Sequence, residues 1–396
     1  MLINANALSI PLTAKSVHTV VTSPPYYGLR DYGVDGQIGL EVTPDEYIAN
    51  LVAVFRECKR ILRDDGTLWV NIGDSYTSDG FNRNSVKLGS GIQADQRAKN
   101  PDYEKQTAAR GSRYYLNCGL KAKDLIGIPW MLAFALRADG WYLRQDIIWA
   151  KPNPMPESVK DRCTKSHEYI FLLSKSAKYY YDSEAVKEES IEPIRAREKN
   201  NGESAVDTKM RGYDGNCGNT GTRNKRDVWT VTTKPYKGAH FATFNPDLIK
   251  PCILAGAPET CCAKCGAPYE RVIEMGKVTS KGGSKTGERA THMGIVSPLG
   301  QDPDKSAYNT GEFVAHEHIT TGFQPTCTCN AGTTKGIVFD PFVGSGTTVA
   351  TAIQLGRKGI GIDLSFKYLH ENAKVRVDEQ RLPLLEIAEA HNDQRA

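Results

Sequence analysis

Asp340-Pro341-Phe342-Val343-Gly344-Ser345-Gly346-Thr347-Thr348 is a glycine-rich turn between two apolar segments of this 396-residue chain. Residues 336–339 before it have the pattern of a buried strand, and residues 347–355 have the pattern of a helix. Glycines in such a turn let the backbone approach a ligand closely, and the helix start offers free N–H groups. Asp363 ends the next predicted strand, 359–362, where a carboxylate can accept hydrogen bonds from a ribose diol. The stretch predicts an α/β fold that binds a nucleoside-containing ligand.

Two other ligand-binding loops share part of this pattern. A phosphate-binding loop would end in Gly-Lys-Ser/Thr, which is absent here. A dinucleotide-binding turn needs Gly-x-Gly-x-x-Gly, and although Gly344 and Gly346 match its first two glycines, Val349 stands at the third. A turn that holds no ligand remains open as an interpretation.

A second stretch near the amino terminus, Thr22-Ser23-Pro24-Pro25-Tyr26, follows a β-branched run at residues 17–21. The run predicts a buried strand, and the two prolines end it because proline cannot continue a ladder of hydrogen bonds. A hydroxyl, carbonyl groups and an aromatic ring then lie at the carboxyl end of a strand. They could accept hydrogen bonds from a planar amino group while the ring stacks on its plane. The alternative is a simple turn with a packed tyrosine.

Together the two stretches resemble the motifs of S-adenosylmethionine-dependent amino-methyltransferases that act on DNA. The first matches the Asp-Pro-Phe-x-Gly-Ser-Gly-Thr-Thr motif, and the second matches the Ser/Asp/Asn-Pro-Pro-Tyr catalytic motif. The catalytic motif comes first along the chain, as in the family's beta arrangement. The resemblance covers residues 1–75, 124–182 and 238–380, and it implies a permuted Rossmann-like α/β methyltransferase sheet. An inserted recognition region and a small cysteine-rich insert of the zinc-knuckle kind would interrupt that sheet.

The resemblance also implies which residues form the site. The catalytic residues would be Ser23, Pro24, Pro25 and Tyr26. The residues implied to hold S-adenosylmethionine are Asn6, Thr22, Thr243, Phe244, Asp340, Pro341, Phe342, Gly344, Ser345, Gly346, Thr347 and Asp363. At two positions the chain departs from the family pattern. Asn6 stands where the family often has an aspartate, and Asn245 separates Phe244 from Pro246 where the family usually has Phe-Pro.

The identity of the methylated base follows less directly from the motif. In the resembling family, serine at the position of Ser23 goes mostly with cytosine N4 and aspartate mostly with adenine N6. Cytosine N4 is therefore the expected acceptor, and adenine N6 is the alternative. A cytosine carbon-5 enzyme would use a Pro-Cys nucleophile, and Pro251-Cys252 has that dipeptide. It lies within the apolar pattern of a predicted helix, 246–255, which favours a core cysteine.

The cysteines predict a metal site rather than disulfides. The chain has 10 cysteines and no pattern of a signal peptide, so a reducing, cytoplasmic location is expected. Cys262-x-x-Cys265 and Cys327-x-Cys329 would supply four thiolates, which suit a closed structural zinc site. Cys261 could replace Cys262, and four free thiols are the alternative.

Charge is distributed unevenly along the chain. The net charge of +4 does not by itself indicate a polyanion, but residues 80–123 carry nine Lys/Arg against three Asp/Glu. The resemblance implies double-stranded DNA as the partner and leaves open a cognate restriction endonuclease. Methylation of RNA or of a protein glutamine is an alternative, and so is a catalytically dead zinc-containing nucleic-acid-binding protein.

The expected organisation has five parts. Residues 1–182 form the catalytic half with a loop insert at 76–123, and residues 183–237 form a target-recognition insert. The remaining parts are a cofactor-lining segment at 238–260, the cysteine-rich insert at 261–335 and the cofactor-binding half at 336–396. Besides the elements given above, the apolar periodicity predicts helices at 44–62, 128–138 and 366–380, and strands at 67–72, 142–150 and 169–174.

Overall fold

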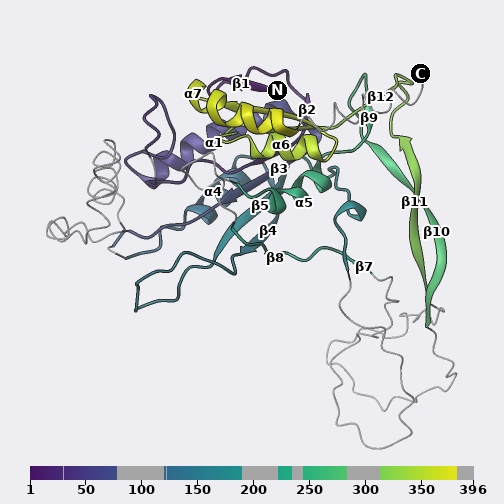
Figure 1. Ribbon diagram of the computed structural model, residues 1–396, viewed down its shortest axis with the longest axis horizontal. Helices are drawn as coiled ribbons and strands as arrows, with labels where there is room; N and C mark the ends of the chain where they lie inside the picture. Colours follow the sequence, from purple (N-terminus) through teal and green to yellow (C-terminus); the bar gives the residue numbers. More distant parts are fainter. Residues whose placement is uncertain are drawn as a thin grey trace, which may run out of the picture. The chain divides into compact units, whose positions relative to one another are not determined.

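The computed structural model describes residues 1–29, 31–77, 120–121, 123–189, 222–233, 244–282 and 313–380 (Figure 1). The chain divides into two compact units. The first contains Met1–Val186, Arg226–Tyr269 and Pro325–Ala396, and the second contains Lys187–Lys225 and Glu270–Gln324. The expected loop insert at 76–123 falls almost entirely outside the described residues.

The first unit is built on an eight-stranded mixed sheet. Its order is β1 (Leu2–Asn4), β14 (Lys358–Asp363), β13 (Ile337–Asp340), β2 (Val17–Thr22), β3 (Leu62–Ile72), β5 (His167–Ser174), β4 (Tyr142–Ala150) and β8 (Val228–Thr230). The first five of these strands run parallel to one another, whereas β5 is antiparallel to both β3 and β4. The carboxyl ends of β14, β13, β2 and β3 therefore meet at one edge of the sheet.

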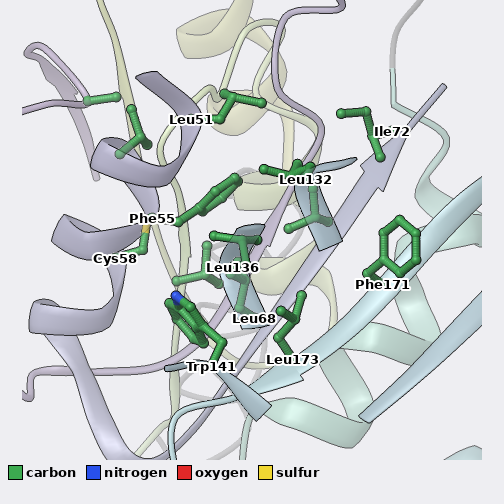
Figure 2. Packing of buried hydrophobic residues seen from close by; sticks show 14 of the residues in the cluster. Leu51, Phe55, Cys58, Leu68, Ile72, Leu132, Leu136, Trp141, Phe171 and Leu173 are labelled. Atoms are coloured by element: carbon green, nitrogen blue, oxygen red, sulfur yellow. The ribbon is translucent and has the colours of Figure 1, made fainter. Parts of the chain in front are cut away.

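Alternate residues of the central strands pack on opposite faces, as the period of a strand requires. Leu68 and Val70 of β3 join the core formed with α1 (Pro44–Ile61) and α4 (Ile128–Ala138). Figure 2 shows this layer, in which side chains of both helices meet those of β3 and β5. Trp69, between them in sequence, packs on the other face with α5 (Pro246–Gly256). The sheet is thus covered by helices on both faces.

Local sequence signals set the helix boundaries. Thr43 caps α1 by accepting a hydrogen bond from the Glu46 N–H, and the Glu46 carboxylate accepts one from the Thr43 N–H. Pro44 occupies the first turn. In the cofactor half, α6 (Thr347–Gln354) has Gly346 as its N-cap residue, with a φ of 79°. The chain then forms β14, the short α7 (Phe366–Tyr368) and a π-helical turn (Leu369–Ala373).

Several short or paired elements complete the description. In the first unit, β9 (Cys261–Cys262) pairs antiparallel with β12 (Thr333–Thr334), and a 3-10 turn (η2) spans Glu184–Val186. In the second unit, β6 (Glu188–Glu189) pairs with β7 (Thr222–Arg223). The long strands β10 (Tyr269–Gly282) and β11 (Phe313–Pro325) form a separate two-stranded sheet.

The sequence pattern located most elements of the first unit within two residues. The helix at 128–138 and the strand at 142–150 are confirmed. The expected strand 67–72 was too short, because β3 starts at Leu62 directly after α1. Val228–Thr230 lies within the range assigned to the recognition insert and yet forms β8, which pairs with β4. Among the described helices, none is long and apolar enough to cross a membrane.

Candidate active site

Both motifs line one cavity of 1710 Å³ in the first unit. Ser23, Pro24, Pro25 and Tyr26 contribute to its wall from the loop after β2. From the cofactor half the lining residues are Asp340, Pro341, Phe342, Gly344, Ser345, Thr347 and Asp363, and Asn6 and Phe244 join them. Two stretches from opposite ends of the chain are thus brought to a common space, as the sequence predicts.

Two of the expected site residues that the structure describes, Thr22 and Gly346, do not line this cavity. Thr22 is buried, and Gly346 caps the start of α6, where an added Cβ would lie 2.9 Å from the Ala373 carbonyl oxygen. A side chain at Gly346 would therefore be rejected, both by that contact and by the positive φ. Thr243 lies outside the described residues.

Thr22 connects the two motifs directly. Its hydroxyl donates a hydrogen bond of 2.7 Å to Asp340 Oδ1, and Thr348 donates one of 2.6 Å to Asp340 Oδ2. The backbone N–H of Phe342 adds a third at 3.0 Å. Asp340 is 2% exposed, and its burial raises the pKa of the carboxyl group to about 6 despite these donors. Asp340 therefore ties the strand end of one motif to the turn of the other.

Asp363 and the glycine-rich turn form the wall on the cofactor side. The backbone N–H of Gly344, at a φ of 48°, donates to Asp363 Oδ2 at 3.1 Å, and the N–H of Ser365 donates to Oδ1 at 2.9 Å. These two contacts orient the carboxylate and leave further lone pairs on both oxygens. Burial raises the pKa of Asp363. This arrangement suits a ribose diol, because the oriented carboxylate can accept hydrogen bonds from its hydroxyl groups and Gly344 beside it has no side chain.

Asn6 reaches the same cavity from the loop after β1, which pairs with β14. Its side-chain oxygen accepts a hydrogen bond of 2.9 Å from the N–H of Leu8. The amide group of Asn6 is therefore oriented by its own turn. An oxygen has a second lone pair, so Asn6 can still accept from an adenine amino group, without the charge of an aspartate.

The Tyr26 ring is held by groups from three strands. Its hydroxyl donates to Glu168 Oε2 at 2.7 Å, and the Asn71 amide donates to the same oxygen at 3.3 Å. Lys151 pairs with the other oxygen of Glu168. Burial and the Glu168 carboxylate raise the pKa of Tyr26 well above its usual value, so the hydroxyl stays a donor. A Cβ at Gly73 would lie 2.8 Å from the ring, which explains the glycine there.

Asn71, Glu168 and Lys151 all line the cavity and were not among the site residues expected from the sequence. For Asn71 a signal exists, because it falls near the carboxyl end of a predicted strand next to that of the catalytic motif. Glu168 and Lys151 come from an antiparallel pair, β5 and β4, where Ala150 lies opposite His167. Their position depends on that register, which the sequence pattern does not reveal.

The four predicted cysteine ligands come together in the first unit. The sulfur atoms of Cys262, Cys265, Cys327 and Cys329 all lie within 4.8 Å of one another. Backbone N–H groups of Cys265 and Lys264 lower the pKa of the Cys262 thiol to about 6, whereas the neighbouring thiols raise the pKa of Cys329 to about 12. This sulfur set fits a closed, tetrahedral zinc site. Cys261 instead donates to the Thr334 carbonyl at 3.4 Å and lies outside the cluster.

Two side chains of the sheet connect the cysteine loop to the core. Arg63 donates to the Cys265 carbonyl at 2.5 Å. His18 of β2 contacts the Gly266 carbonyl through Nε2 at 2.9 Å and accepts from the Ile337 N–H through Nδ1 at 3.0 Å. Because Nδ1 accepts, Nε2 must carry the proton and donate. Cys252 of α5 is 1% exposed and packs in the core, as expected for a packing cysteine.

The comparison with known families identifies the chain as an S-adenosylmethionine-dependent DNA methyltransferase. The chain belongs to the DNA methylase family of N6/N4 methyltransferases, whose family model matches residues 17–260 and 312–374. The resemblance stated from the motifs is thereby confirmed.

Individual relatives show the extent of the similarity. The chain is 52% identical to the type II methyltransferase M.Cfr9I of Citrobacter freundii over 256 residues, which are 64% of this chain and 71% of the relative. It is 49% identical to the type II methyltransferase M.SmaI of Serratia marcescens over 239 residues, 60% of this chain and 68% of the relative. Among solved structures it is similar to the cytosine-N4-specific PvuII DNA methyltransferase, with 13% identity and a TM-score of 0.48, covering 95% of this chain and 85% of that one.

Proposed function

We propose that this DNA methyltransferase transfers a methyl group to the exocyclic amino nitrogen of a base flipped out of double-stranded DNA, and that the base is cytosine, modified at N4. The observation that carries the proposal is the single cavity lined by Ser23 and Tyr26 on one side and by Gly344 and Asp363 on the other. An acceptor and a donor bound at these two walls would share one space. Adenine N6 is the alternative acceptor.

On the acceptor side, the loop after β2 would bind the amino group. The lone pair of an exocyclic amino nitrogen is delocalised into the ring, so the nitrogen is a poor nucleophile. Hydrogen bonds from its two N–H groups to the Ser23 hydroxyl oxygen and the Pro24 carbonyl would favour a pyramidal nitrogen whose lone pair is available. The Tyr26 ring would stack on the base and replace part of the stacking lost on flipping.

On the donor side, Asp363 would accept hydrogen bonds from the ribose hydroxyl groups, and Asn6 would accept from the adenine amino group. The turn at 340–347 would approach the ligand through its backbone, and Phe244 would line the opposite end together with Thr243. S-adenosylmethionine, when bound, supplies an activated methyl group on a positively charged sulfur. The chain's own contribution is to align the two reactants at near-attack distance, which can supply much of the rate acceleration.

Ser23 favours cytosine over adenine only through the family's habit at this position. A hydroxyl oxygen can accept from either amino group, so the base must be determined by experiment. The chain would be incubated with isotopically labelled S-adenosylmethionine and mixed-sequence genomic DNA, and the DNA digested to nucleosides for mass spectrometry. N4-methyl-2′-deoxycytidine is expected, and N6-methyl-2′-deoxyadenosine would show that adenine is the acceptor instead. Absence of any labelled nucleoside would refute the proposal.

Variants separate the two walls of the cavity. Ser23→Ala and Tyr26→Ala are expected to abolish transfer while calorimetry still detects binding of S-adenosylmethionine. Asp363→Ala is expected to weaken that binding. Full turnover of Ser23→Ala would show that the Ser23 hydroxyl is not needed to bind the amino group of the base.

The organisation of the chain is part of the proposal. The position of β13 and β14 between β1 and β2 supports a permuted methyltransferase sheet, with the cofactor half supplied by residues 336–396. Residues 183–237 would recognise the target sequence, and residues 261–335 would form a cysteine-rich insert braced by zinc at Cys262, Cys265, Cys327 and Cys329. We also propose a cytoplasmic location and a cognate restriction endonuclease acting on the same site.

A further inference from the structure

The loop at 151–166, between β4 and β5, exposes one large apolar side chain at the cavity. Met155 is 86% exposed, the highest value among the large apolar side chains that the structure describes. It stands between Pro154 and Pro156, whose rings restrict the backbone on either side. Met155 also lines the same cavity as Ser23 and Tyr26. A single exposed apolar residue is common on protein surfaces, but one that lines the cavity can contact whatever binds there.

The rest of the loop is braced by hydrogen bonds. Asn153 accepts from the Thr233 N–H at 3.0 Å, and Lys165 donates to the Asp74 carbonyl at 2.5 Å. Between them, Glu157 accepts from Arg162 at 2.6 Å. The Arg162 guanidinium in turn lies 4.0 Å from the centre of the Tyr76 ring. These contacts hold the loop in place, so the exposure of Met155 does not result from a loop without packing contacts.

The charge of the loop suits a polyanion. Lys151 pairs with Glu168 of β5, Arg162 with Glu157, and Asp161 with Lys123. Lys160 and Lys165 then leave the loop with an excess of positive charge. Such an excess attracts the phosphates of a duplex to this rim of the cavity. A duplex held there would bring its base stack to Met155.

We propose that Met155 is the wedge that enters the DNA base stack and fills the gap left by the flipped nucleotide. The inference rests on the proposed function, because only a flipping enzyme leaves such a gap. Unstacking a base costs free energy, and apolar side chains such as methionine, leucine and phenylalanine can be inserted between base steps. Met155 would act on the DNA left behind while Ser23 and Tyr26 act on the extruded base. It would thus favour flipping without touching the reacting amino group.

The test compares two duplexes. Both carry the sequence found to be methylated in the mixed-sequence DNA assay, one with the target base normally paired and one with it opposite an abasic site. The abasic partner removes the pairing that flipping must break. Met155→Ala, Met155→Leu and the control Val159→Ala would be compared by kcat/KM for methyl transfer. Val159 is an exposed apolar residue of the same loop that does not line the cavity.

Met155→Ala is expected to lower kcat/KM about tenfold or more on the paired duplex and less than about twofold on the abasic one. Met155→Leu should retain activity on both duplexes, and Val159→Ala should match the wild type. Fluorescence of 2-aminopurine at the target position would report flipping directly, and its rise on binding should be smaller for Met155→Ala.

Equal activity of Met155→Ala and wild type on the paired duplex would overturn the wedge and leave the methyltransferase proposal standing. An equal loss on both duplexes would also overturn it, because Met155 would then serve general DNA or protein contact. Absence of transfer to any DNA by the wild type would instead refute the proposed function, and the wedge with it.

Discussion

Thr22 donates a hydrogen bond of 2.7 Å to Asp340, although 318 positions separate the two residues in the chain. Thr22 ends β2 and Asp340 ends β13, and these strands are parallel neighbours. The contact joins the last residue before the catalytic motif to the first residue of the cofactor motif. The buried carboxyl group of Asp340 therefore fixes the position of the catalytic motif relative to the cofactor motif.

The raised pKa of Asp340 predicts a stability term that depends on pH. Its folded-state pKa of about 6 exceeds the ordinary carboxyl value of 3.8, so between these values the folded chain binds more protons than the unfolded chain. Stability from this group is full below about pH 4 and is lost as the pH rises through 6. Asp340→Asn removes this loss, so its stability relative to wild type should improve by about 3 kcal/mol from pH 4 to pH 7.

Urea denaturation at several pH values measures this difference. Asp161→Asn is the control, because Asp161 is an exposed acid whose pKa is lowered by Lys123, so any effect has the opposite sign. Parallel pH profiles for wild type and Asp340→Asn would contradict the raised pKa.

Glu168 is predicted to position Tyr26 for transfer. Glu168→Ala removes the acceptor of the Tyr26 hydroxyl and the partner of Lys151. A hydrogen bond to a charged group contributes about 1.5–3 kcal/mol, so kcat should fall about 10- to 100-fold. The affinity for S-adenosylmethionine should be unchanged in calorimetry, and Glu168→Gln should recover part of kcat because it keeps an acceptor oxygen.

Tyr142→Phe serves as the control for loss of a tyrosine hydroxyl. Tyr142 is exposed at the start of β4 and does not line the cavity. Comparison with Tyr26→Phe should show a loss of kcat only at position 26. A lower affinity of Glu168→Ala for S-adenosylmethionine would show that Glu168 serves the cofactor rather than Tyr26.

Gly73→Ala should disturb the acceptor side by steric contact alone. The added Cβ would lie 2.8 Å from Tyr26 Cε2 and 3.4 Å from Glu168 Cδ, so the ring must shift. Small displacements of a reacting group are costly, and kcat is expected to fall about 10- to 100-fold while S-adenosylmethionine binding persists. Gly322→Ala, where nothing lies within 4 Å, is the matched control. Unchanged transfer in Gly73→Ala would show that the position of the ring is not limiting.

The cysteine cluster is predicted to hold about one zinc ion per chain, measurable by elemental mass spectrometry. Cys327→Ser or treatment with a chelator should remove the metal and lower the melting temperature by several degrees. The exposed Cys163, outside the cluster, provides the control Cys163→Ser. If the wild-type protein is purified without metal and its melting temperature does not change on addition of a chelator, the four cysteines are free thiols.

The sequence predicted those parts of the site that depend on local pattern. The strand–turn–helix at 336–355 and the Pro-Pro end of β2 each carry their own signal. That both belong to one cavity also followed, because carboxyl ends of parallel strands meet at one edge of a sheet.

Features that depend on distant pairing could not be predicted. Glu168 reaches Tyr26 only through the register of β5 against β3, where Tyr169 lies opposite Ile72. The contact of Arg63 with Cys265 spans 202 positions and leaves no trace in either segment alone. β8 is three residues long, too short for a periodic pattern to identify. The recognition role of residues 183–237 stays a prediction.

The place of β13 beside β2 has a consequence for synthesis on the ribosome. Thr22, at the end of the strand that bears the catalytic loop, is made 318 residues before Asp340, at the end of the neighbouring strand Ile337–Asp340. Until then β2 lacks half of its backbone partners and the donor wall does not exist. We therefore expect chains that terminate before residue 337 to be inactive, even though they retain the Ser-Pro-Pro-Tyr loop.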